Sequence, residues 1–477
     1  MQMPAVYLLP FVAAAPLLQG VMDLRLQAFF QLLAFALFAW SLARRRELPA
    51  GPLPAMLALA AALSALSVYF SPLREAVFFE WGALAAGFCL FSMAGGQSVR
   101  DRALTDRALR AAAWGVAAVA LYQAFFLKSP NVSSTLVNPN ALAFFILLAG
   151  PAAVSRGSFA LTAVLALVFF LTGSVGALLA LIAASSALAF IYLRKDNDRR
   201  MMLVLAGLAA AALLALTQSD FISADNRLEW WRAAAAMIKD APLLGSGHSS
   251  FTWLYPLYKA PGAAEASVYA HNYYLEFAAE NGVPAALAWF SLIGFAVAGA
   301  RRLALFGLLA ALVHSCLDFG MSLPANFWLF CILAGREVPA GEDEWFRVPA
   351  KPAAAFAALL AAAAAVSLSA PLSYEKEMSS ASASLAAGEE DKALAALKRA
   401  AGVPYGRAAA EESAGRLRLA RASKSGDSVE LFLAASEFEK ALLKMPSRRG
   451  SAAALRGIYR RAGAPALADH PRLGADE

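Results

Sequence analysis

The polar residues best suited to chemistry in this sequence gather in one stretch, residues 218–282. Arg227 stands there beside two tryptophans, and His271 opens a run of asparagine and tyrosine residues. A neutral imidazole, with an unperturbed pKa of about 6.5, is suited to act as a general base at neutral pH. A guanidinium is a planar, permanently charged group that binds anionic oxygens. These two residue types suit a reaction that needs both a base and an anion ligand.

Three further polar residues are candidates for a role in or near the same site. His314 and Asp318 are one helical turn apart, and we expect a structural hydrogen bond between them. Together with His248 they would also suit metal ligation, but no group of residues has the spacing of a zinc site. No metal ion and no cofactor are predicted.

The composition identifies the class of protein that must hold these residues. Of the 477 residues, 60% are hydrophobic and only 16% are charged, whereas soluble domains are roughly half apolar and a quarter charged. This excludes secreted disulfide scaffolds and nucleic-acid-binding proteins. The three cysteines lie in apolar runs, where small buried hydrophobic side chains are expected. The sequence predicts an all-α, polytopic membrane protein.

Apolar segments long enough to cross a membrane recur from the N-terminus to residue 371. We expect about 12–13 transmembrane helices, since each crossing needs about 20 apolar residues. The first segment has no basic region before it, so we interpret it as a span and not a removable signal. The expected spans are 4–21, 26–43, 53–70, 76–95, 108–126, 139–154, 158–173, 176–193, 201–217, 283–300, 303–320, 322–335 and 352–371.

The positions of the basic residues predict the orientation of these spans. Lysine and arginine collect in cytoplasmic loops of membrane proteins, and four basic loops fall on one side of the predicted membrane. They contain Arg44–Arg46, Arg100 to Arg110, Arg194 to Arg200 and Arg301–Arg302. The N-terminus is therefore expected in the cytoplasm, and the loop 218–282, with four basic and seven acidic residues, on the outside. This bias also explains the net charge of +7 without an acidic partner.

Two elements outside the spans are expected to be helical. Trp230, Ala234 and Met237 share one helical face, which predicts a helix over 226–240 lying on the membrane surface. Residues 372–477 are more charged and rich in helix formers, so we expect a soluble periplasmic domain after a transmembrane domain of residues 1–371. Alanine-rich helical pairs at 381–400 and 432–464 resemble degenerate tetratricopeptide repeats, although other helical bundles share that pattern. This domain is predicted to bind a protein partner and to contribute no catalytic group.

The ordered set of motifs in residues 130–335 resembles the O-antigen ligase and O-antigen polymerase superfamily. The large loop carries three of them: Arg227, the turn Pro242–Gly247, and the run His271–Gly282. Asn138-Pro139-Asn140 before a span and His314 to Asp318 with Pro324 after the loop are also similar to that family's pattern.

This resemblance implies an inverting, metal-independent glycosyltransferase with a GT-C-like membrane fold. Its donor would be a glycan on undecaprenyl diphosphate, used at the periplasmic face of a bacterial inner membrane. With the chemistry of the side chains given above, we expect His271 to be the catalytic base and Arg227 to bind the diphosphate. Arg232 and Lys259 are further candidates for binding the diphosphate. The expected supporting residues are Asn138, Asn140, Asn272, Tyr274, His314 and Asp318.

The sequence departs from the family pattern at one position. The family often has an arginine in a Ser-Arg-Gly-like motif, where this chain has Ser174-Val175-Gly176. Three explanations stay open. Another basic residue, such as Lys128, Arg232 or Lys259, contacts the diphosphate; or the donor is bound differently; or the chain has lost activity.

Several functions within and outside this family are compatible with the sequence. Ligation of O-antigen to lipid A-core is favoured slightly, because the outer loop at 127–138 contributes only Lys128, whereas such polymerases often have paired basic loops. The alternatives are an O-antigen or exopolysaccharide polymerase and a protein O-oligosaccharyltransferase. A transporter is less favoured, because no internal repeat with polar residues in mid-span is found. A silent assembly scaffold is the remaining alternative.

Overall fold

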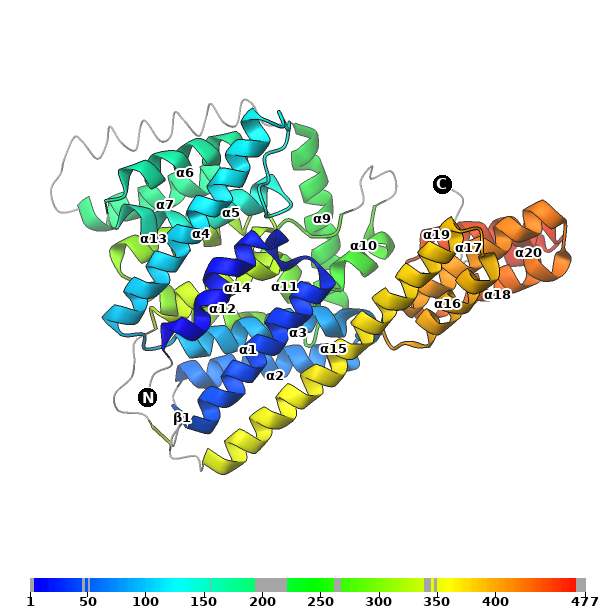
Figure 1. Cartoon of the computed structure of the whole chain (residues 1–477), viewed down its shortest axis with the longest axis horizontal. Coiled ribbons are helices and arrows are strands. Elements are labelled where there is room, and N and C mark those ends of the chain that lie inside the picture. The colour runs from blue at the N-terminus through cyan, green and yellow to red at the C-terminus, as the bar shows by residue number, and fades with distance from the viewer. Residues whose placement is uncertain are drawn as a thin grey trace.

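The structure is a computed structural model that describes most of the chain. It covers residues 4–44, 48–49, 52–155, 157–193, 221–260, 267–338, 345–346 and 350–468. Within these ranges the regular elements are helices, apart from two-residue strands β1 (Leu48–Pro49) and β2 (Trp345–Phe346), which pair antiparallel. The predicted all-α class is therefore confirmed (Figure 1).

Apolar helices make up the body of the molecule, as expected for a polytopic membrane protein. Four of them have the length and composition to cross a membrane. These are α1 (Leu24–Arg44), α2 (Pro52–Phe70), α3 (Arg74–Ala94) and α4 (Val99–Phe125). Shorter apolar helices accompany them: α5 (Pro139–Val154), α6 (Phe159–Leu171), α7 (Val175–Leu193), α12 (Val283–Ala298), α13 (Arg302–His314) and α14 (Pro324–Gly335). The predicted span 201–217 lies outside the described residues.

Two of the predicted spans differ from the structure in form. Residues 5–21 are not one regular helix but four short 3-10 and π turns, η1 (Ala5–Leu8), η2 (Pro10–Ala14), η3 (Ala15–Leu17) and η4 (Gln19–Val21). Prolines at 10 and 16 remove amide donors and interrupt the regular pattern. The predicted span 303–320 is also too long, because α13 ends at His314 and an irregular segment leads to η5 (Gly320–Ser322).

The core of the membrane part is built around α14, in which every residue is buried. Helices α3, α5, α12 and α13 all contact it. It packs closely on α3, because Gly87 leaves room for Phe327 and Gly335 lies against the backbone of Phe91. The indole of Trp328 donates to the Ala83 carbonyl at 2.8 Å. Small residues at such contacts let helices approach where no water drives them together.

Three helices of the large loop cover one end of this core. They are α9 (Phe221–Asp240), α10 (Phe251–Tyr258) and α11 (Tyr273–Asn281). The predicted helix over 226–240 is present, but its expected lipid-facing side is buried in protein. Trp230, Ala234 and Met237 pack in one cluster with residues of α10 and α11. The prediction of a surface-lying face was wrong, because the same 3.6-residue period serves a protein contact and a lipid contact equally well.

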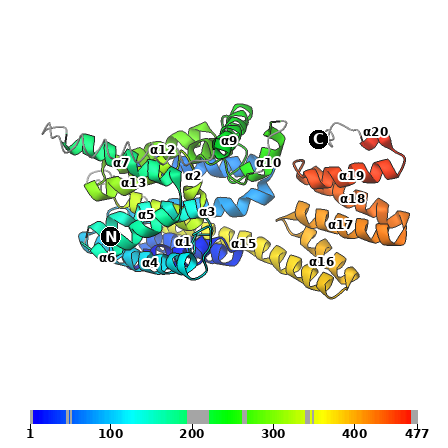
Figure 2. The same cartoon turned by 90° about the horizontal axis from the view of Figure 1, so that it is seen from above.

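The C-terminal part consists of helices that project from this end of the molecule (Figures 1 and 2). Helix α15 (Ala350–Ala386) runs along α1 and continues without a break into this part. It is followed by α16 (Glu390–Gly402), α17 (Arg407–Ser425), α18 (Ser428–Lys444), α19 (Arg449–Arg461) and α20 (Pro465–Ala468). Gly415 lets α17 approach the ring of Phe438 on α18. The tetratricopeptide assignment stays a prediction.

The C-terminal helices contact the large loop as well as the membrane helices. Ala408 and Met445 are buried in a cluster with Val77, and Trp253 of α10 packs against this cluster. Arg449 donates from Nη2 to the carbonyl of Pro256 at 2.9 Å. The C-terminal part is therefore attached to the same loop that carries Arg227 and His271.

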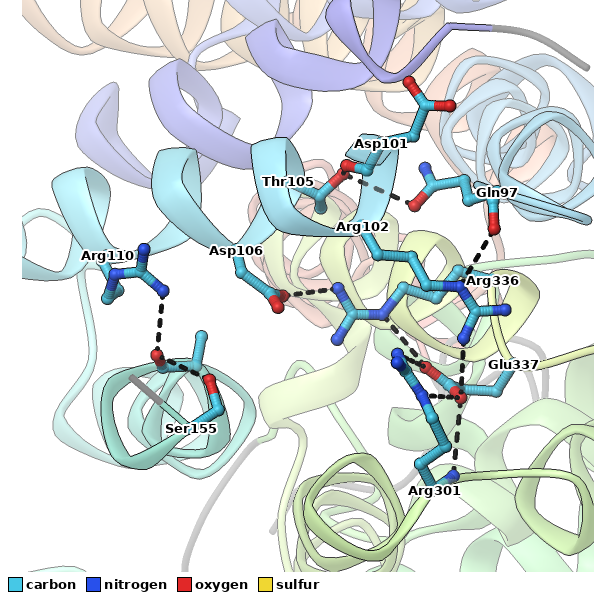
Figure 3. Close-up of polar contacts among 11 residues, drawn as sticks. Gln97, Asp101, Arg102, Thr105, Asp106, Arg110, Ser155, Arg301, Arg336 and Glu337 are labelled. Carbon is cyan, nitrogen blue, oxygen red and sulfur yellow. Dashed lines mark hydrogen bonds and ion pairs between the residues drawn. The ribbon is translucent and has the colours of Figure 1, made fainter. Parts of the chain in front are cut away.

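At the opposite end, arginines from the predicted cytoplasmic loops are paired with acidic residues (Figure 3). Glu337, whose side chain is 1% exposed, lies 3.3 Å from Arg102 and 3.2 Å from Arg301. Arg336 bonds Asp106 at 2.7 Å. This network joins the beginnings of α4 and α13 to the end of α14, and so fixes the bundle far from the large loop.

Candidate functional site

One buried carboxylate collects the polar residues of four separate segments. The Asp318 side chain is 2% exposed, and its Oδ2 accepts a hydrogen bond from Asn140 Nδ2 at 2.6 Å. Arg227 Nη2 lies 3.6 Å from this oxygen, and His271 Nδ1 lies 3.7 Å from it. Its Oδ1 accepts from the Phe319 amide at 2.8 Å. The structure thus brings three residues that the sequence singled out, Asn140, Arg227 and His271, around a fourth, Asp318.

The local sequence explains how α5 and α13 place two of these groups. Asn138 caps α5, accepting from the Asn140 amide at 2.8 Å, and Pro139 takes the first helical position, where no amide donor is needed. Asn140 is therefore held in the first turn. Asp318 follows the end of α13, where its amide donates to the His314 carbonyl at 3.0 Å. A polar residue next to an apolar helix thus points back into the protein.

His271 is held in an unusual backbone conformation between two aromatic rings. Its φ of 52° lies in the left-handed region, which costs energy for a residue with a Cβ atom. Trp230 stacks on the imidazole at 4.6 Å between ring centroids, and Phe319 meets it edge-on at 4.8 Å. The next residue, Asn272, caps α11 by accepting from two amides at 3.1 Å. Nδ1 faces Asp318 Oδ2 at 3.7 Å, and it has no hydrogen-bond partner among the described residues.

Arg227 is only partly satisfied by its carboxylate neighbour. Its side chain is 29% exposed and lies at ion-pair distance from Asp318. The buried Nε atom has no hydrogen-bond partner among the described residues. A guanidinium offers five N–H donors, so an anionic ligand would find free donors here.

The other predicted diphosphate ligands lie elsewhere in the described structure. Arg232 points to solvent, with a side chain 71% exposed, and pairs with Glu229. Lys259 follows the last residue of α10, two positions before residues 261–266, which are outside the described part. Lys128 is exposed in the loop after α4. Of the lysines and arginines that the structure describes, Arg227 forms the ion pair with Asp318.

Of two predicted supporting residues, Tyr274 forms a side-chain hydrogen bond and His314 does not. The Tyr274 hydroxyl donates to the Leu312 carbonyl at 3.0 Å, which fastens α11 to α13. His314 does not form the expected side-chain bond with Asp318. Both of its ring nitrogens lack a hydrogen-bond partner within the described residues, and the ring packs 5.8 Å from Phe144. The two residues are joined through the backbone instead, because the chain leaves the helix at this point.

Three helices begin near Asp318, close to position 175, where this chain lacks the arginine of the family pattern. Helix α7 begins at Val175, and a Cβ atom on Gly176 would lie 3.6 Å from the Leu317 side chain. The start of α11 is also close, since the Tyr273 amide donates to the Ser315 carbonyl at 2.9 Å. Helices α5, α7 and α11 therefore begin beside the 314–319 segment. Each N-terminus carries a partial positive charge, and together they favour an anion at this place.

Two buried carboxyl groups on α11 were not anticipated from the sequence. Glu276 and Glu280 are 5% and 3% exposed. Burial raises the pKa of Glu276 to about 7. Burial, together with the negative charge of Glu276, raises the pKa of Glu280 well above its usual range. His248 lies 3.5 Å from Glu280, and burial lowers its pKa to about 4. The spacing of four residues was the available signal, since it places both carboxyl groups on one helical face.

The aromatic neighbours of His271 were also missed as parts of the site. The sequence placed Trp230 at a membrane surface and did not single out Phe319. Both contact the imidazole, from α9 and from the segment after Asp318. Phe319 follows Asp318 directly, but only the fold brings it to a histidine far away in the sequence. The cysteines differ from expectation in one case, since Cys316 is exposed while Cys331 is buried.

Comparison with known proteins gives one match in the central part of the chain. Residues 159–290 match a protein-family model described as O-antigen ligase. The matched residues include Arg227 and His271, while Asn140 and Asp318 lie outside them. No protein among the curated sequences matches the chain.

Proposed function

We infer that this chain, which through residues 159–290 belongs to the O-antigen ligase and polymerase superfamily, transfers a glycan from a lipid diphosphate to an acceptor hydroxyl. The observation that carries this proposal is the convergence of Arg227 and His271 on Asp318. One is a cation whose Nε has no partner among the described residues, and the other is a base whose Nδ1 faces the carboxylate. Such a pair is what the departure of a diphosphate and the activation of a hydroxyl require.

In the proposed reaction, His271 is the general base. Nε2 takes the proton of the acceptor hydroxyl, whose oxygen forms a bond to the anomeric carbon of the donor sugar. The bond between that carbon and the phosphate oxygen breaks, and the diphosphate leaves with both electrons. Attack from the face opposite to the leaving group inverts the anomeric centre.

Asp318 has two roles in this proposal. It orients the imidazole by facing Nδ1 at 3.7 Å, and it stabilises the imidazolium that forms when Nε2 gains a proton. It also holds Arg227 in place. An incoming diphosphate would draw the guanidinium away from the carboxylate, which would then be left to the histidine.

Arg227 and the neighbouring helix ends bind the leaving group in this proposal. A departing diphosphate gains negative charge, so groups that favour an anion accelerate the step. The N-termini of α5, α7 and α11 supply part of the positive potential that the family obtains from the missing arginine. Arg232 and Lys259 stay secondary candidates, because neither has a described contact with Asp318.

The substrates follow from the family and from the sequence. The donor is proposed to be an undecaprenyl-diphosphate-linked O-antigen, and the acceptor lipid A-core, at the periplasmic face of the inner membrane. Lys128 as the sole basic residue of the 127–138 loop supports a ligase over a polymerase. No metal ion takes part in the proposal. The large loop and the C-terminal part would both lie in the periplasm, where the latter contacts α10.

Two substitutions with different expected failures test the mechanism. His271→Ala should lower the rate of transfer by about 10²–10⁴, the usual contribution of a general base, while donor binding stays nearly intact. Arg227→Ala should lower the rate of transfer and also weaken donor binding, because the diphosphate is charged before and after it departs. The measurements are donor affinity and glycan transfer in nanodiscs. Lys239→Ala is the matched control, since this lysine lies near the other end of the same helix and is exposed.

Three outcomes would contradict parts of this proposal. Near-normal transfer by His271→Ala would remove the general-base assignment. Loss of wild-type activity on adding a chelator would show that a metal ion is required. Transfer to single repeat units or to a protein, with none to lipid A-core, would replace the ligase by a polymerase or a protein glycosyltransferase.

A further inference from the structure

The carboxyl group of Glu276 connects the two segments that carry His271 and Asp318. Its Oε2 accepts from the amide of Ala270, the residue before His271, at 2.6 Å. Its Oε1 accepts from the hydroxyl of Ser322 at 2.9 Å. Ser322 ends η5, the turn that follows Asp318. One buried side chain therefore bonds to the residue before His271 and to the last residue of the turn that follows Asp318.

The bond to Ala270 goes beyond what the start of α11 requires. In an ordinary capping box, a glutamate in the third helical position bonds to the amide of the capping residue. Here the cap is Asn272, and Glu276, in the fourth position, reaches an amide two residues before it. That amide belongs to the turn in which His271 has its left-handed φ of 52°. Such a conformation persists only where the surroundings hold it.

A ring contact joins the same two segments as Glu276, whereas Glu280, one turn further along α11, holds a different segment. Tyr269 stacks on Phe319 at 4.6 Å, which is a second link between the His271 and Asp318 segments. Glu280 instead accepts from the Phe251 amide at 3.0 Å and so holds the start of α10. The two buried carboxyl groups are similar in surroundings but hold different segments.

We propose that Glu276 is the positioning residue of the site, which sets the imidazole of His271 against Asp318 by bonding Ala270 and Ser322 at once. This rests on the proposed function for its effect on turnover, but not for its effect on the histidine ring. Without the bridge, the 269–271 turn is free to relax toward ordinary backbone angles. The imidazole would then leave its place between Trp230 and Phe319.

Kinetics of four variants test the bridge. Glu276→Ala should lower kcat by about 10²-fold, since a misplacement of about 1 Å has an effect of this size, with little change in KM for the donor. Ser322→Ala should lower kcat less, and adding it to Glu276→Ala should cause no further loss, because the bridge is already broken. Glu276→Gln should restore kcat to within a few-fold of wild type. Its amide oxygen can accept from Ala270, and its NH₂ can donate to Ser322.

Histidine NMR tests the same proposal without any substrate. The chain has four histidines, and the His271 signal is assigned by its loss in His271→Asn. Its ring lies between two aromatic rings and should carry a ring-current shift. Glu276→Ala should abolish that shift, Glu276→Gln should keep it, and Glu280→Gln, the matched control, should alter the His248 signal instead.

The results separate this inference from the proposed function. An unchanged His271 shift in Glu276→Ala, or additive losses for Glu276→Ala and Ser322→Ala, would overturn the positioning role. A folded wild-type protein that transfers no glycan to any of the three acceptor classes would overturn the proposed function. In that case the NMR comparison still decides whether Glu276 positions His271.

Discussion

At the scale of single residues, Asp318 determines how the other groups of the site are arranged. It is nearly inaccessible, yet Arg227, His271, Asn140 and the Phe319 amide all lie against it. A buried carboxylate is stable when charged and polar neighbours surround it in this way. The same surroundings make its charge, more than its shape, the property on which the site depends.

Replacing this charge should affect turnover and donor binding in opposite directions. Asp318→Asn keeps the size of the side chain but no longer stabilises an imidazolium, so kcat should fall by about 10²-fold or more. Donor affinity should be kept or increased, because Arg227 loses a competing anion. Transfer kinetics and donor titrations with wild type and variant check this. Weaker donor binding with normal kcat would mean that Asp318 serves only the donor site.

A second prediction at this scale concerns His248, which lies near the site but outside the proposed reaction. Burial lowers its pKa from 6.5 to about 4, so the folded protein binds this proton less readily than the unfolded chain. The contribution of His248 to the free energy of unfolding should therefore fall as the pH drops from about 6.5 toward 4, whereas Glu276 and Glu280, whose pKa values are raised, contribute in the opposite direction. The difference between wild type and a His248→Asn variant isolates the histidine. NMR of the ring should show a neutral imidazole at pH 6. A protonated His248 at that pH would contradict the burial argument.

At the scale of elements, the sequence predicted the helices better than the surfaces they cover. Apolar runs identify membrane helices, and the Asn138 and Asn272 caps mark where α5 and α11 begin. The period of Trp230, Ala234 and Met237 could not distinguish a lipid contact from the contact with α10 and α11. The bonds from Glu276 to Ala270 and Ser322 could not be predicted from the sequence either. Ala270 and Ser322 are far apart along the chain, and only the fold brings η5 close to the start of α11.

A pair of substitutions tests whether the Ala234 face of α9 packs against protein or faces lipid. Ala234 is fully buried and Ala235, the next residue, is exposed. Ala234→Leu should overpack the contact with α10 and α11 and lower the free energy of unfolding by about 1–3 kcal/mol. Ala235→Leu, the control, should change it little. Thermal unfolding in nanodiscs measures both, and equal effects of the two would mean that this face is not packed in protein.

At the scale of the whole molecule, the candidate site and the arginine network lie at opposite ends of the helices. The network around Glu337 binds arginines that the positive-inside rule assigns to the cytoplasm. The fold alone does not orient the molecule in a membrane, because both ends carry polar residues.

Cysteine labelling from one side decides the orientation. In a background without Cys89, Cys316 and Cys331, an impermeant maleimide should label Leu243→Cys in intact spheroplasts. Leu243 is in the large loop and 69% exposed. Val99→Cys, the matched control at the other end, is 84% exposed and should react only after permeabilisation. The reverse pattern would place the site in the cytoplasm and exclude a periplasmic reaction.

The unbroken course of α15 has a consequence for how the C-terminal helices face the membrane. An α-helix turns by about 100° and rises about 1.5 Å with each residue, so the 37 residues of α15 fix both the azimuth and the height of everything after it. Inserting one residue near position 380 would rotate the C-terminal helices by about 100° around the axis of α15. The hydrogen bond from Arg449 to the Pro256 carbonyl would then break. Removing seven residues, nearly two turns, would keep the azimuth and lower the C-terminal helices by about 10 Å. The length of α15 therefore determines which surface of the large loop the C-terminal helices can reach.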